Sequence, residues 1–246
     1  MLKGGFLSGK VSPKSFMKFL ELRQPGYDLL VGTGIEIGGF EHPAILPRAG
    51  KTIRCDRITR QEAQQLFPEV DATRLPSVDV CLDLDTEGLA HFGDGSLDFV
   101  VCCHVLEHLK NPIQAIREFF RVLKTGGLAA LAVPDKHFTF DVNRPLTEWE
   151  PLEYFFSQKI NTPVARDYFD IATFIHPNLL TMPETELEKQ LTIFMHRREH
   201  LNIWDSKTFP EFLRKAFSLL QIDCKILYEC GADQNSFEYF AIIEKS

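Results

Sequence analysis

Residues 97–134, LDFVVCCHVLEHLKNPIQAIREFFRVLKTGGLAALAVP, decide the fold. Two apolar runs, at 97–103 and 128–133, flank a segment whose apolar residues recur every three or four positions. That segment starts at Pro112 and ends at Gly126-Gly127, as helices commonly do. Strands that are apolar almost throughout, joined through a helix, are typical of a parallel sheet buried on both faces.

The same alternation extends toward the N-terminus. Short apolar runs at 34–38, 52–56 and 78–82 predict three further strands, and 61–67 has helical spacing. Repeated exchange of strand and helix indicates a doubly wound α/β fold in which helices cover both faces of the sheet.

The C-terminal part follows a different rule. Residues 208–220 predict a helix, and two strand-like runs follow at 224–229 and 237–243. The connection at 231–235 is too short for a parallel crossover, so these strands form an antiparallel hairpin. We therefore predict a seven-stranded, mostly parallel sheet that ends in this hairpin.

One domain over residues 1–246 accommodates these elements, with two additions. Residues 1–27 form an N-terminal extension, with a helix predicted at 13–21 and stopped by Gln24-Pro25-Gly26. Residues 135–206, rich in aromatic, Pro, His and Arg residues, are too long for a plain connection after the fifth strand. We expect them to form a helical substrate cap over the carboxyl edge, where such sheets bind ligands.

Composition limits the function. The 44% hydrophobic and 25% charged content is that of an ordinary globular protein, and a net charge of −7 argues against a nucleic-acid partner. No apolar run approaches a membrane span or a signal peptide, which predicts a cytoplasmic protein. Its six cysteines are expected to be mostly buried thiols. The oligomeric state is not indicated.

Candidate ligand-binding residues follow the first three strands. Glu36, Gly38 and Gly39 stand at the end of the first strand, where glycine lets a ligand approach the backbone. Asp56 ends the second strand, where an acidic side chain accepts hydrogen bonds from ribose hydroxyls in nucleoside-binding folds. Asp83, or Asp85 near it, can accept a hydrogen bond from the exocyclic amine of adenine. Together they indicate an adenosine-containing ligand, although each alone is also compatible with a turn or a helix cap.

Several motifs resemble class I S-adenosylmethionine-dependent methyltransferases, in particular the type 11-like, bacterial glycan-associated branch. The resemblance is strong over residues 28–145. The motifs are GIEIGG at 34–39, CDRIT at 55–59, VDVCLDLD at 78–85, DGSLDFVVCCHVLEHLKNP at 94–112 and AIREFFRVLKTGGLAALAVPD at 115–135.

The resemblance implies S-adenosyl-L-methionine as cofactor and a small-molecule or glycan acceptor, methylated at a hydroxyl. It places Glu36 and Gly38 at the cofactor loop, Asp56 at the ribose and Asp83 near the adenine. Cys103 and His104 then lie beside the methionine part of the cofactor.

The loop after the first strand departs from the family pattern. Gly38 is followed by Gly39-Phe40-Glu41, so the family's second close-approach glycine is displaced. A catalytically degenerate domain that serves as a binding scaffold is therefore the alternative function. A nicotinamide dehydrogenase is disfavoured, because this loop lacks G-x-G-x-x-G.

Methyl transfer is an in-line displacement that depends mainly on positioning, and a base helps when the acceptor is a hydroxyl. His104 and His137 are the predicted catalytic residues, because a histidine pKa lies near working pH. Asp141 and Arg144 are further candidates in the loop after the fifth strand, the arginine as an orienting group. For His137 and Asp141, an ordinary loop role is the competing interpretation.

Residues 104–108, HVLEH, also match the H-x-x-E-H pattern of a zinc hydrolase. That site needs both histidines on one continuing helix, whereas His104 closes a strand and Asn111-Pro112 begins a new helix. With no third ligand at a persuasive spacing, we expect no metal. Glu107 and His108 are expected to fix the turn through hydrogen bonds to nearby backbone.

Overall fold

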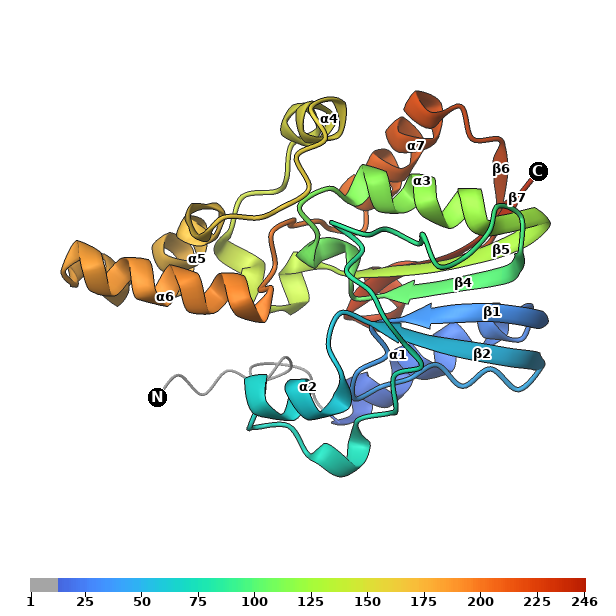
Figure 1. The fold of residues 1–246 in the computed structure, drawn as a ribbon, viewed down its shortest axis with the longest axis horizontal. Helices are drawn as coiled ribbons and strands as arrows, with labels where there is room; N and C mark the ends of the chain where they lie inside the picture. The colour runs from blue at the N-terminus through green and yellow to red at the C-terminus, as the bar shows by residue number, and fades with distance from the viewer. Residues whose placement is uncertain (1–12) are drawn as a thin grey trace.

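The computed structural model describes residues 13–246, so residues 1–12 of the predicted extension lie outside the described chain. One seven-stranded sheet runs through it in the order β3-β2-β1-β4-β5-β7-β6 (Figure 1). Strands β1 to β5 are parallel, and β7 is antiparallel to both β5 and β6, which confirms the predicted fold. The strands are β1 (Gly32–Ile37), β2 (Ala49–Asp56), β3 (Val80–Cys81), β4 (Leu97–Cys103), β5 (Leu123–Pro134), β6 (Cys224–Cys230) and β7 (Glu238–Lys245).

Helices lie on both faces of the sheet. The apolar sides of α3 and α7 pack on one face, and α1 packs against β6 and β7 on the other (Figure 1). The predicted face of α3 is buried, and the Asn111 side chain caps this helix by accepting the Gln114 N–H at 3.1 Å. The helices are α1 (Pro13–Tyr27), α2 (Arg60–Leu66), α3 (Pro112–Val122), α4 (Trp149–Ser157), α5 (Phe169–Phe174), α6 (Glu184–Arg197), α7 (Thr208–Leu220) and α8 (Ala232–Asn235).

Helix α1 does not stop where the sequence predicts. It continues through Pro25 to Tyr27, six residues beyond the expected end at 21. Tertiary contacts hold this last turn: Tyr27 is buried, and a Cβ on Gly26 would lie 2.7 Å from side-chain atoms of Ile242 and Phe240. Packing on the sheet therefore overrides the local stop signal.

Strand β3 is shorter than expected and lies at the edge of the sheet. Cys81 on this strand is consequently exposed, contrary to the expectation for buried cysteines, whereas Cys55, Cys102 and Cys230 are buried. All six cysteines are free thiols.

Residues 135–206 contain α4, α5 and α6, and Figure 1 shows α5 and α6 beyond the carboxyl ends of β1 and β4. This insertion has an apolar core of its own, formed by Tyr168, Ile171, Leu179, Leu191 and Phe194. Within residues 13–246, no helix is long and apolar enough to cross a membrane.

Candidate functional site

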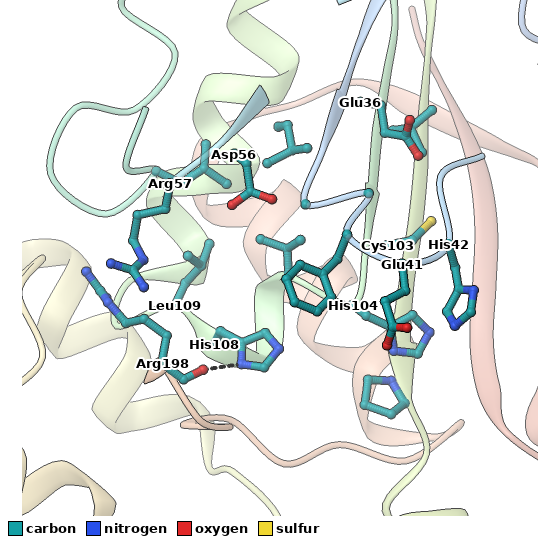
Figure 2. A pocket seen from close by; sticks show the side chains of 18 of the residues that line it. Glu36, Glu41, His42, Asp56, Arg57, Cys103, His104, His108, Leu109 and Arg198 are labelled. Carbon is teal, nitrogen blue, oxygen red and sulfur yellow. Dashed lines mark hydrogen bonds between the residues drawn. The ribbon is translucent and has the colours of Figure 1, made fainter. Parts of the chain in front are cut away.

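A large pocket opens at the carboxyl edge of the sheet, between the strand ends, the end of α1 and the insertion. Figure 2 shows Arg57 and Arg198 at one end, Cys103 and His104 at the other, and Asp56 between them. Every residue predicted to bind the cofactor lines this one pocket: Glu36, Gly38, Gly39, Asp56, Asp83, Cys103 and His104.

The loop after β1 depends on Gly38. Its φ of +67° lies in the left-handed region, and a Cβ there would lie 2.4 Å from Cγ2 of Val105. The buried Glu36 carboxylate fixes the rest of the loop by accepting the Ala44 N–H at 2.5 Å. Burial raises the pKa of Glu36, against this hydrogen bond and nearby arginines. The displaced second glycine thus leaves a tight and well-held turn.

Asp56 ends β2 with its carboxylate at the pocket. Burial raises the pKa of Asp56, although backbone hydrogen bonds from Ile58 and Arg57 oppose the shift. The Ile58 N–H lies 3.4 Å from Oδ1, a long contact. A half-desolvated carboxylate with so little direct bonding is suited to accept hydrogen bonds from a ligand hydroxyl.

Asp83 and Asp85 have different roles. Asp85 is buried and accepts the backbone N–H groups of Lys110 and Asn111, each at 3.0 Å, so it ties the strand ends together. Asp83 lines the pocket. Arg198, just after α6, joins both carboxylates, each at 2.7 Å. The insertion is thereby anchored at the Asp83 end of the pocket, a contact that sequence analysis missed because 115 residues separate Arg198 from Asp83.

His104 is held between two carboxylates. Its Nε2 lies 2.6 Å from Oε2 of Glu238 and its Nδ1 lies 3.5 Å from Oε1 of Glu107. Its φ of +58° turns the chain at the end of β4, and its ring stacks on Phe237. Burial opposes protonation, but the two carboxylates outweigh it and raise the pKa of His104. A raised pKa makes this ring a weaker general base than an unperturbed histidine, so its role is better sought in positioning.

Arg23 of α1 completes this end of the pocket and was not predicted. Its Nε and Nη2 donate to Oε1 and Oε2 of Glu238 at 2.6 and 2.5 Å, with both side chains buried. Cys103 lies beside them, and burial raises the pKa of its thiol to about 11. The thiol is therefore neutral. The signal in the sequence was a charged residue on the apolar face of a short helix.

The second predicted catalytic residue, His137, lies outside the pocket lining. Its side chain is 59% exposed, and its Nδ1 pairs with Oδ1 of Asp135 at 2.7 Å. Asp141 and Arg144 are buried and paired with each other at 2.7 Å, so they belong to the packing of the insertion. The structure thus brings His104 to the pocket and leaves His137 and this pair outside the lining.

The HVLEH segment is not one helix. A single 3₁₀ turn, Leu106–His108, follows β4. His108 does bond backbone, but its partner is distant in sequence: Nδ1 lies 2.5 Å from the Arg198 carbonyl oxygen, as the dashed line in Figure 2 marks. The expectation for Glu107 is wrong, because neither carboxylate oxygen makes a hydrogen bond to the part of the chain whose side chains are described, residues 19–246, although the side chain is buried.

Comparison with known proteins finds similarity to one family over part of the chain. Residues 32–131 match the family model described as a methyltransferase domain. A probable S-adenosylmethionine-dependent methyltransferase from Mycolicibacterium smegmatis is 33% identical over 81 residues. That alignment covers 33% of this chain and 30% of the relative, so the chain matches less than a third of the relative's length.

Solved structures add a likeness of fold. A protein from Rhodobacter sphaeroides, described as a putative Zn-dependent alcohol dehydrogenase, has a TM-score of 0.51 at 14% identity, over 96% of this chain and 91% of its own. A methyltransferase from Aquifex aeolicus has a TM-score of 0.48 at 10% identity, over 96% and 94% of the two chains. At 14% identity, the likeness to the Rhodobacter sphaeroides protein concerns the fold alone.

Proposed function

We propose that this protein transfers a methyl group from S-adenosylmethionine to a hydroxyl of a small-molecule or glycan acceptor, because residues 32–131 match a methyltransferase domain and a partial relative is described as S-adenosylmethionine-dependent. The observation that carries the proposal is the convergence of all seven predicted cofactor residues on one pocket. They come from the ends of four parallel strands, where doubly wound sheets bind nucleotides.

The residues present fit this cofactor. Gly38 lines the pocket with its backbone alone. No side chain can be added at this turn, because a Cβ would collide with Val105. The Asp56 carboxylate is placed to accept hydrogen bonds from both ribose hydroxyls. Asp83 is placed to accept a hydrogen bond from the adenine amine, in addition to the one from Arg198. Cys103, His104 and Arg23 border the opposite end, where the methionine part would lie. The cofactor, when bound, supplies a methyl group on a positively charged sulfur.

The protein's own contribution is position and the exclusion of water. Glu238, held by Arg23, fixes the ring of His104 in its strained position after β4. That ring can orient an acceptor hydroxyl for in-line attack, which requires close and collinear reacting atoms. We assign His104 this orienting role in place of the predicted general base.

Residues 135–206 are proposed to cap the pocket and to select the acceptor. Thr139, Phe140, Arg197, Arg198 and His200 of this insertion line the pocket directly. Phe140 is 40% exposed although it is aromatic, as expected for a side chain that contacts a bound ligand. A flat apolar wall beside polar groups suits a sugar or another small hydroxylated acceptor.

The test is transfer of a labelled methyl group from S-adenosylmethionine to a panel of sugars, sugar phosphates, small hydroxylated acids and proteins. We expect labelled product with at least one hydroxylated small molecule. Asp56→Asn should reduce the rate at limiting cofactor, and the exposed Asp94→Asn, outside the pocket, is the matched control. Cofactor binding without transfer to any member of the panel would support the scaffold alternative, and labelling of protein alone would contradict the proposed acceptor.

A further inference from the structure

A second arrangement of ligating groups lies beside this pocket. One coordinating atom each of Glu107, His108 and His200 lies within 4.8 Å of the others. The first two belong to the 3₁₀ turn after β4, and His200 belongs to the insertion, 92 positions further along the chain. All three residues are buried or nearly so, with side chains between 1% and 12% exposed.

Backbone contacts explain why this distant histidine arrives at the turn. The carbonyl oxygen of Glu107 accepts the N–H groups of Leu201 and Asn202 at 2.7 and 2.9 Å. The Asn202 side chain also donates to the Leu109 carbonyl oxygen at 2.7 Å. These bonds clamp the residues that follow α6 onto the turn, so His200 is fixed against Glu107 and His108 by main-chain geometry.

The Glu107 carboxylate points to a missing ligand. Its side chain is 1% exposed, and neither oxygen makes a hydrogen bond among the side chains described, those of residues 19–246. The groups near Oε1 are two imidazole nitrogens, His104 Nδ1 at 3.5 Å and His108 Nε2 at 3.9 Å. A buried carboxylate without hydrogen bonds is costly, and such groups are normally paired or bound to a metal.

The two histidines carry the outer contacts that metal ligands usually have. His108 Nδ1 donates to the Arg198 carbonyl oxygen at 2.5 Å, and His200 Nδ1 lies 2.6 Å from Oδ2 of Asp141. Asp141 is itself held by Arg144 at 2.7 Å. Metal-bound histidines commonly donate their second ring N–H to a carbonyl or carboxylate, which fixes the orientation of the ring.

We propose that Glu107, His108 and His200 bind one divalent transition-metal ion, with zinc the best match to the ligands. Two imidazoles and a carboxylate form a known zinc set, and metal bonds of about 2.0–2.2 Å require the ligand atoms to move closer by only about 1 Å. The ion would give the buried Glu107 carboxylate a direct bond, where its nearest groups now are His104 at 3.5 Å and His108 at 3.9 Å.

Three protein ligands leave a coordination position open, as in catalytic rather than structural zinc sites. His108 and His200 also line the pocket, so this position faces its interior. An oxygen atom of a hydroxylated acceptor is the ligand that fits there, a point that rests on the proposed function. Metal binding itself needs neither cofactor nor acceptor.

The experiment therefore uses the full chain alone, stripped with a chelator and titrated with Zn²⁺ against a chromophoric competitor. We expect one ion per chain. Glu107→Gln should weaken binding by more than the roughly 10–100-fold that loss of an outer contact costs. His91→Ala, which removes an exposed histidine outside the pocket, is the matched control and should bind like the wild type.

Co²⁺ substitution of the wild type gives a second readout that needs no variant. A visible spectrum typical of a four- or five-coordinate site with nitrogen and oxygen ligands supports the proposal. A sulfur-to-cobalt band would place the ion on a cysteine, such as the exposed Cys81, and overturn it. Absence of stoichiometric Zn²⁺ binding, or equal binding by the wild type and a folded Glu107→Gln variant, would also overturn it, whether or not the chain binds S-adenosylmethionine.

Discussion

Replacement of Gly38 by alanine tests the cofactor loop on its own geometry. The residue has a φ of +67°, which costs a residue with a Cβ about 1–2 kcal/mol. Its new Cβ would lie 2.4 Å from Cγ2 of Val105, and relief of such overpacking costs about 1–3 kcal/mol more. We expect Gly38→Ala to lower the free energy of unfolding by about 2–5 kcal/mol, the sum of these two effects.

The two effects can be separated with Val105→Ala, because the Cβ of Val105 lies 3.8 Å from the Cβ that an alanine at position 38 would add, an ordinary contact. In that background Gly38→Ala should cost only the backbone strain of about 1–2 kcal/mol. The double-mutant cycle therefore predicts a favourable coupling of about 1–3 kcal/mol, the part due to overpacking.

Urea unfolding of the four proteins, followed by far-ultraviolet circular dichroism, measures this coupling. Costs that add to within about 0.5 kcal/mol would refute the steric argument. A Gly38→Ala variant as stable as the wild type would refute the strained geometry of the loop as well.

Three further predictions concern the charged groups of the pocket. Asp56→Asn removes the charge from at least one ligand hydrogen bond worth about 1.5–3 kcal/mol, so calorimetry should show S-adenosylhomocysteine affinity weakened by at least about 10-fold, and an unchanged affinity would exclude Asp56 from the site. Arg23→Met leaves Glu238 buried without its guanidinium partner and should lower the free energy of unfolding by about 3–5 kcal/mol in urea, whereas a loss below about 1 kcal/mol would contradict the buried pair. Burial and nearby positive charges lower the pKa of His42 to about 4 in the folded protein. The unfolded chain therefore binds this proton first as the pH falls, and the free energy of unfolding decreases between about pH 6.5 and about pH 4. His42→Asn should reduce that pH dependence by at most about 1.4 kcal/mol per pH unit, and an unaltered dependence would contradict the shift.

The sequence predicted the elements whose local and long-range signals agree. Strand β4 has its predicted bounds, because its apolar run is central in the sheet and buried on both faces. Prediction failed at α1 and β3, where tertiary packing and an edge position decide the ends. The contact between Gly26 and Phe240 has no signal in the local sequence, so the sequence could not predict that α1 continues to Tyr27.

The same limit applies to the site. Residues at strand ends were predictable, since the carboxyl ends of parallel strands share one edge. The contacts of Arg198 with Asp83 and of His200 with Glu107 join segments about 90 or more positions apart. The H-x-x-E-H segment is a 3₁₀ turn and not one helix, as predicted, but its local spacing gives no sign that His200 of the insertion lies beside it.

The central claim is that the pocket at the ends of β1, β2 and β4 binds S-adenosylmethionine. Calorimetric titration of the purified full chain with S-adenosylmethionine and S-adenosylhomocysteine tests it most directly. We predict saturable binding of both at one site per chain, weakened in Asp56→Asn and unchanged in Asp94→Asn. No heat of binding to the folded wild type at millimolar ligand would contradict the claim.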